Sequence, residues 1–128
     1  MKHYKVVEQS ESDPSQFSSV MPYRYPWRLR YRIGEWTEPA VPGTKLFVFR
    51  SLPAARLFNY TCAYNGAVFE CEVRGQPKQP KLMTDPLVAK MRRFWVRLAS
   101  GLPPGDLGCP PPRATLWVDA VKLGQRLE

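Results

Sequence analysis

Proline is the residue that most constrains the fold of this chain. The sequence has 14 prolines in 128 residues, a share about twice the average of roughly 5 %. Because proline ends helices and cannot donate a hydrogen bond to a sheet ladder, we expect a fold with many loops and sheet edges. Two long loops are predicted: the polar segment 9–22 and the segment 101–113, which holds five prolines and three glycines.

Five segments have the composition, or the alternation of apolar and polar residues, that predicts β-strands. They are 3–8, 27–36, 45–50, 67–74 and 114–123. Strict alternation along 27–36 predicts a strand with one solvent-exposed face. Four successive apolar residues in 45–50, and apolar residues on both faces of 114–123, predict strands in the interior of the sheet.

Two helices are predicted between these strands. Ser51 is a suitable N-cap for the first, Pro53 occupies its second position, and the turn signal Asn65-Gly66 predicts an end near 60–65. Its apolar side is expected to contain Ala54, Ala55, Leu57 and Phe58. Asp85 and Pro86 are the start signals of the second helix, which should span roughly 86–100. Its apolar face is expected to contain Leu87, Met91, Phe94, Trp95 and Leu98.

These elements predict an α+β fold: a small mixed, mainly antiparallel sheet of four or five strands with two helices packed on one face. The length and an apolar share of 44 % fit one hydrophobic core, so we expect a single domain over 1–128. Leu127 and Glu128 have the composition of a cloning remnant, and the prediction gives them no structural role.

The charge of the chain favours a protein that binds anionic partners. The sequence has 19 Lys and Arg against 11 Asp and Glu, a formal net charge of +8, which attracts nucleic acids and acidic protein surfaces. The longest apolar runs are too short for a signal peptide or a membrane span. We therefore expect a cytoplasmic protein without a membrane partner.

Catalytic and metal chemistry have little support in the sequence. One histidine serves the whole chain, and no G-x-S-x-G motif or phosphate-binding glycine loop is present. The cysteines Cys62, Cys71 and Cys109 are odd in number and lack C-x-x-C spacing, which argues against a disulfide framework and a zinc site. We expect a non-enzymatic protein that needs no cofactor or metal.

Arginines at alternate positions are the first candidate binding feature. They are Arg24, Arg28, Arg30 and Arg32. The opposite face of this strand, with Trp27, Leu29, Tyr31 and Ile33, should point into the core, so the arginines lack the exposed stacking rings of single-stranded nucleic-acid binders. Three interpretations stay open: a solvated face paired with Glu70 and Glu72 of a neighbouring strand, a surface for phosphates or an acidic protein, and a dimer interface.

A second basic group lies on the predicted helix. Its stripe consists of Lys90, Arg93 and Arg97. With the neighbouring Lys78, Lys81 and Arg92 it makes 78–97 the most basic region of the chain. Since no Asn or Gln stands on this helix to read bases, it would bind a nucleic-acid backbone without sequence preference. The alternative is an ordinary solvated helix face.

We expect a small binding or adaptor module whose exposed basic face meets a protein or a nucleic-acid backbone. The many aromatic residues make self-association, as a homo-oligomer, a further expectation. The alternative is a small-molecule pocket, or a minor enzyme, between the sheet and the helix 86–100. That pocket would be lined by Phe47, Arg56, Tyr60, Trp95 and Trp117, residues that otherwise belong to the core.

Overall fold

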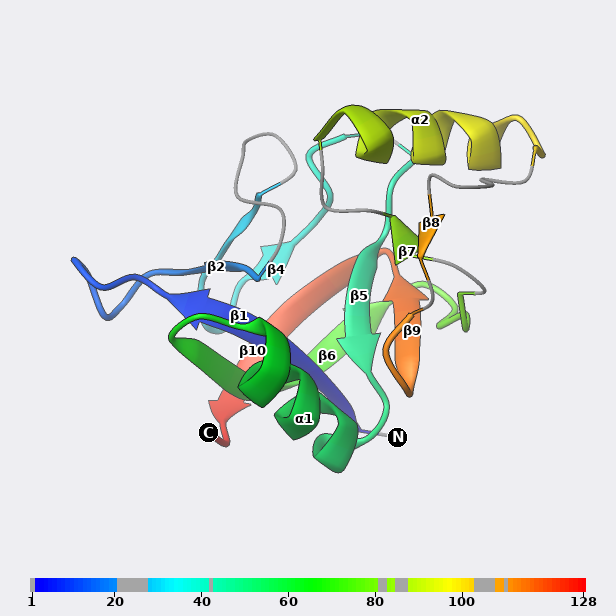
Figure 1. The fold of residues 1–128 in the computed structure, drawn as a ribbon. Helices are drawn as coiled ribbons and strands as arrows, with labels where there is room; N and C mark the ends of the chain where they lie inside the picture. Colours follow the sequence, from blue (N-terminus) through cyan, green and yellow to red (C-terminus); the bar gives the residue numbers. More distant parts are fainter. Residues whose placement is uncertain are drawn as a thin grey trace.

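The computed structural model describes residues 2–20, 28–41, 43–80, 83–84, 88–102, 108–109 and 111–128. Within these ranges the fold is α+β, with two helices, an antiparallel sheet of eight strands and a separate pair of short strands (Figure 1). In chain order the elements are β1 (His3–Gln9), β2 (Phe17–Ser19), β3 (Arg30–Tyr31), β4 (Trp36–Thr37), β5 (Leu46–Phe49), α1 (Leu52–Cys62), β6 (Gly66–Arg74), β7 (Met83–Thr84), α2 (Val88–Ala99), β8 (Gly108–Cys109), β9 (Thr115–Val118) and β10 (Ala120–Arg126).

The predicted α+β class is confirmed, but the prediction of four or five strands was too low. Part of the difference arises because β2 lies inside the segment 9–22, which was expected to be a loop, and because β3 and β4 replace the predicted strand 27–36. The segment 101–113, also expected to be a loop, contains β8, which belongs to the separate pair with β7. The predicted strand 114–123 is also two strands, β9 and β10, separated by Asp119. Short strands with few residue pairs leave no readable alternation in a sequence.

The strands close a ring around a shared interior. One edge of β1 pairs with β6 from His3 to Glu8, and β6 pairs with β10. Asp119 connects β10 to β9, the strand before it in the chain, and β9 pairs with β5. β5 in turn pairs with β1 at Tyr4 and Phe49, which closes the ring. The other edge of β1 also pairs with β2, which pairs with β3. Alternate residues of each strand therefore face one common core.

That core is the largest buried apolar cluster among the described residues. Its members are Val7, Phe17, Tyr31, Leu46, Val48, Ala67, Phe69, Cys71, Leu116, Val118, Val121 and Leu123. They come from β1, β2, β3, β5, β6, β9 and β10, so the interior binds the strands of the ring together. Within β6, Ala67, Phe69 and Cys71 alternate along the strand and are buried in this core.

Both helices cover the same face of β5, opposite to this interior. Phe49 packs in the cluster under α1, and Phe47, two residues earlier, packs in the cluster under α2. Residues two apart on a strand point to the same side. Figure 1 shows α1 in front of the strands and α2 at the top of the molecule.

Local signals explain the position of α1. The Ser51 hydroxyl accepts a hydrogen bond from the Ala54 N–H at 3.4 Å, as an N-cap does, and a proline stands in the first turn. The helix ends before Asn65, whose φ of 52° makes the predicted turn into β6. The expectation that Leu57 is on the apolar side is wrong, because α1 packs through Leu52, Ala55 and Phe58 and leaves Leu57 62 % exposed.

The prediction of one continuous strand over 27–36 is also wrong. Trp27 lies outside the described residues, and the remainder contains only the two short strands β3 and β4. Gly34, with a φ of 80°, turns the chain between them, and its N–H donates to the Leu123 carbonyl at 2.9 Å. Tyr31 is buried and Leu29 packs against the interior, as expected, but Ile33 is 57 % exposed.

Candidate anion-binding surfaces

The outer side of α2 carries an arginine cluster, which we call the α2 arginine face: Arg92, Arg93 and Arg97. All three side chains are exposed. At about 100° per residue, Arg93 lies on the side away from Phe94 and Trp95, with Arg92 and Arg97 on either side of it. Phe94 and Trp95 are buried, as the sequence predicted. The predicted start of the helix at Asp85 and Pro86, and the side chain of Lys90, lie outside what the structure describes.

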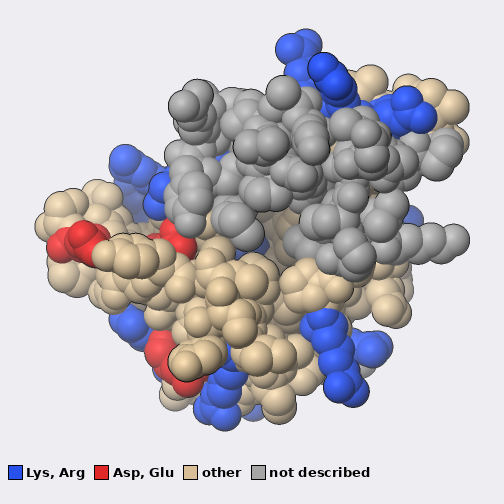
Figure 2. All heavy atoms as spheres, viewed as in Figure 1, with Lys and Arg blue, Asp and Glu red and all other residues tan. Residues whose placement is uncertain are grey.

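No carboxylate offsets this face within its own segment. From Pro86 to Gly105 the sequence contains four cations, Lys90 among them, and no Asp or Glu. Arg92 and Arg93 make no hydrogen bond or ion pair with any residue in the described part of the chain. In Figure 2 basic side chains stand on α2, whereas the described acidic side chains of this view lie on the left side of the molecule.

The rings under α2 form a packed cluster. The centroids of Phe47 and Trp95 are 6.5 Å apart, those of Phe47 and Trp117 are 6.2 Å apart, and those of Trp95 and Trp117 are 5.4 Å apart. Three of the five residues expected to line a pocket here are therefore together. The other two belong to α1, where Tyr60 is 89 % exposed and Arg56 lies 3.7 Å from a carboxylate oxygen of Glu128.

The alternating arginines occupy different environments. Arg24 lies outside the described residues, and Arg30 and Arg32 are exposed. Arg28 is half-buried and donates a hydrogen bond to the Ser18 hydroxyl at 2.8 Å. The strands next to β6 are β1 and β10, so this row is not adjacent to the carboxylates of β6. Those carboxylates form ion pairs with other residues, Glu70 with Lys2 at 3.6 Å and Glu72 with Lys122 at 2.7 Å.

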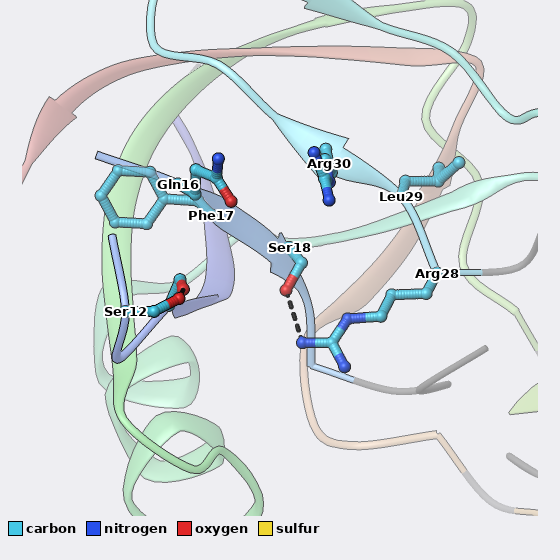
Figure 3. Close-up of a pocket in the computed structure, with 8 residues that line it drawn as sticks. Ser12, Gln16, Phe17, Ser18, Arg28, Leu29 and Arg30 are labelled. Carbon is cyan, nitrogen blue, oxygen red and sulfur yellow. Dashed lines mark hydrogen bonds between the residues drawn. The ribbon is translucent and has the colours of Figure 1, made fainter. Parts of the chain in front are cut away.

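An open pocket of about 730 Å³ lies beside Arg28 and Arg30. We call it the Arg28–Arg30 pocket, and its lining residues are Ser10, Ser12, Gln16, Phe17, Ser18, Arg28, Leu29 and Arg30. Figure 3 shows the Arg28 guanidinium turned toward Ser18, with Gln16 and Arg30 above them in the view. Nothing in the sequence indicated that five of these residues, those from the segment 9–22, belong to the site, because only the pairing of β2 with β3 brings that polar segment to the arginines.

The acidic residues of the β1–β2 loop are engaged outside this pocket. Asp13 accepts hydrogen bonds from the N–H of Ser15 at 3.0 Å and from its hydroxyl at 2.7 Å, and these bonds lower the pKa of Asp13. A hydrogen bond with the Glu11 carboxylate raises the pKa of the Tyr64 hydroxyl. The described lining of the pocket contains two guanidinium groups and no carboxylate.

Three polar groups lie inside the ring of strands. The Lys5 ammonium donates to the Phe47 carbonyl at 2.7 Å and lies 5.2 Å from the centre of the Tyr31 ring. His3 is buried, its Nε2 has no hydrogen-bond partner in the structure, and burial lowers its pKa. Burial also raises the pKa of the Cys71 thiol to about 12. Cys71 is therefore protonated at neutral pH and resembles a small apolar side chain more than a nucleophile.

Among the described residues no three His, Cys, Asp or Glu side chains are grouped closely enough to hold a metal ion. No helix in the same part of the chain has the length and apolar character needed to cross a membrane. Comparisons with protein-family models, with curated proteins and with solved structures found no match to this chain.

Proposed function

We propose that the protein binds the backbone of nucleic acids, without sequence preference, through the α2 arginine face. The observation that carries this proposal is the exposure of Arg92, Arg93 and Arg97 in a stretch without carboxylates. The buried Phe94 and Trp95 hold the opposite side of the helix against β5 and β9. The arginines thus stand on an anchored element, and a guanidinium group binds a phosphate through two parallel hydrogen bonds.

The composition of this face favours phosphate contacts over other modes of recognition. The rings of α2 are buried and so are not exposed for stacking on unpaired bases. Among the described side chains of α2, Val96, at 58 % exposure, is the one large apolar group in solvent. Protein interfaces are usually built around several buried apolar or aromatic anchors, so this face suits a polyanion better than a protein partner.

The test is a salt titration of binding to fluorescent duplexes of two unrelated sequences, followed by anisotropy. Each neutralised phosphate contributes about −0.9 to the slope of log K against log salt, so contacts from three arginines predict about −2.7. Both sequences should give the same affinity. In the variant Arg92→Gln/Arg93→Gln the slope should fall to about −0.9, with weaker binding at every salt concentration.

The matched control is Arg50→Gln/Arg113→Gln. These two arginines are exposed, lie outside α2, and their replacement changes the net charge by the same amount. This control should keep most of the affinity and of the salt slope. The proposal is wrong if the wild-type protein does not bind at about 50 mM salt, or if the control weakens binding as much as the α2 variant.

A further inference from the structure

We infer that the Arg28–Arg30 pocket binds the phosphate monoester of a small hydroxylated molecule, which goes beyond the proposed backbone binding. The volume of about 730 Å³ falls within the range of roughly 300–1,000 Å³ that small-ligand sites have. Two cations line it, together with three serines and one glutamine, and its apolar surface comes from Phe17 and Leu29. This lining therefore offers two positive charges and several hydrogen-bonding groups beside an apolar surface.

Arg28 is held in place before any ligand arrives. Its guanidinium donates to the Ser18 hydroxyl at 2.8 Å and lies 4.0 Å from an Oε atom of Glu8. Glu8 is itself buried, and its other oxygen accepts a hydrogen bond from the Tyr64 N–H at 2.7 Å. A positioned guanidinium loses little further conformational freedom on binding.

Arg30 supplies the second charge. It lies opposite Ser18 in the pairing of β3 with β2, and it lines the same pocket as Arg28. Its side chain is exposed and makes no hydrogen bond or ion pair with a described residue. Among the described residues, the one carboxylate paired with these two arginines is that of Glu8, so a dianion gains more from this pocket than a carboxylate does.

The neutral side chains of the lining indicate which groups the ligand carries besides its phosphate. Ser10 and Ser12 have their hydroxyl oxygens 3.1 Å apart, and Gln16 adds an amide to the same lining. These groups can both donate and accept hydrogen bonds, as the hydroxyl groups of a polyol or sugar do. Phe17 is only 5 % exposed, so it gives no open ring for a nucleobase to stack on.

Isothermal titration calorimetry at constant ionic strength tests this site, with glycerol phosphate, inorganic phosphate and glycerol as probes. Glycerol phosphate should bind at one site per chain, inorganic phosphate should bind more weakly, and glycerol should give no heat of binding. Arg30→Gln should weaken glycerol phosphate binding about tenfold or more, since a charged hydrogen bond is lost. Ser12→Ala should reduce the preference for glycerol phosphate over inorganic phosphate.

Arg32→Gln is the matched control, because Arg32 is exposed, makes the same change of charge and does not line the pocket. It should stay within about twofold of the wild type. The inference is overturned if neither phosphate binds, if Arg32→Gln weakens binding as much as Arg30→Gln, or if both phosphates bind equally. The variant Arg92→Gln/Arg93→Gln should keep the calorimetric signal, and Arg30→Gln should keep duplex binding, so each proposal can fail without the other.

Discussion

Histidine 3 shows how burial decides the behaviour of a single residue. It is 7 % exposed on the interior side of β1, opposite Cys71 on β6. Its Nε2 lacks a hydrogen-bond partner among the described residues, so protonation inside the fold would leave a charge without compensation. Burial, and to a smaller extent the positive N-terminus, therefore lower the pKa of His3 from its ordinary value of 6.5.

This lowered pKa predicts that acid destabilises the fold through His3. The unfolded chain takes up a proton near pH 6.5 and the folded chain only at lower pH, so stability is full above that value and falls as the pH decreases below it. The free energy of unfolding should decrease by at most about 1.4 kcal/mol per pH unit from this one proton. Urea unfolding of the wild type and of His3→Gln between about pH 7.5 and pH 5 measures the difference.

The control for this experiment is internal, since His3 is the single histidine of the chain. Its imidazole signals in an NMR titration follow the same proton without interference from another histidine. If the wild type and His3→Gln lose stability in parallel as the pH falls, the assignment of the acid effect to His3 is wrong.

At the scale of elements, the predictions that succeeded are those with local causes. The Ser51 cap and the left-handed Asn65 fix both ends of α1 within a few residues of the sequence signals. The prediction of one strand over 27–36 failed for a reason distant in the sequence. The partner of β3 is β2, which is only three residues long, and Ile33 forms an isolated bridge with Leu123 of β10 instead. Alternation indicates which residues can form a strand, but the length of a strand depends on the partner.

The junction between α1 and β6 is close-packed at Gly66, and this predicts a strong effect of Gly66→Ala. An added Cβ would lie 1.8 Å from Oδ1 of Asn59 and 2.6 Å from the Cβ of Ala63. Relief of these overlaps requires α1 to move away from the start of β6. The substitution should reduce the free energy of unfolding by about 1–3 kcal/mol, measured by urea unfolding with circular dichroism.

A double-mutant cycle distinguishes this overlap from a general loss of backbone freedom. Asn59→Ala removes the Oδ1 atom, which is buried and has no hydrogen-bond partner in the part of the chain that the structure describes. The double variant Asn59→Ala/Gly66→Ala should therefore lose less stability than the two single variants together, with a coupling of about 0.5 kcal/mol or more. Additive losses would show that the contact with Asn59 is not the cause.

At the scale of the whole molecule, neither the ring of strands nor the Arg28–Arg30 pocket has a signal in any single segment. The ring depends on β1 lying between β6 on one edge and β5 and β2 on the other. The pocket depends on the register that sets Ser18 opposite Arg30. By contrast, helical periodicity predicted Arg93 and Arg97 on one stripe of α2 from sequence alone, with Arg92 as a neighbour of that stripe.

The eight-stranded sheet is unequal in strength, which predicts its pattern of hydrogen exchange. β1 and β6 share six residue pairs around fully buried Val7, Val68 and Phe69, whereas β3 and β4 each contribute two residue pairs to the sheet. Amides of β1 and β6 should therefore exchange only through global unfolding, and those of β3 and β4 through local opening at a lower free energy. Equal protection of β3 and β6 in exchange measured by NMR would contradict this ranking.

Because the Arg28–Arg30 pocket joins β2 to β3, glycerol phosphate should slow exchange at β3 and leave β4 unchanged, and Arg30→Gln should abolish that effect.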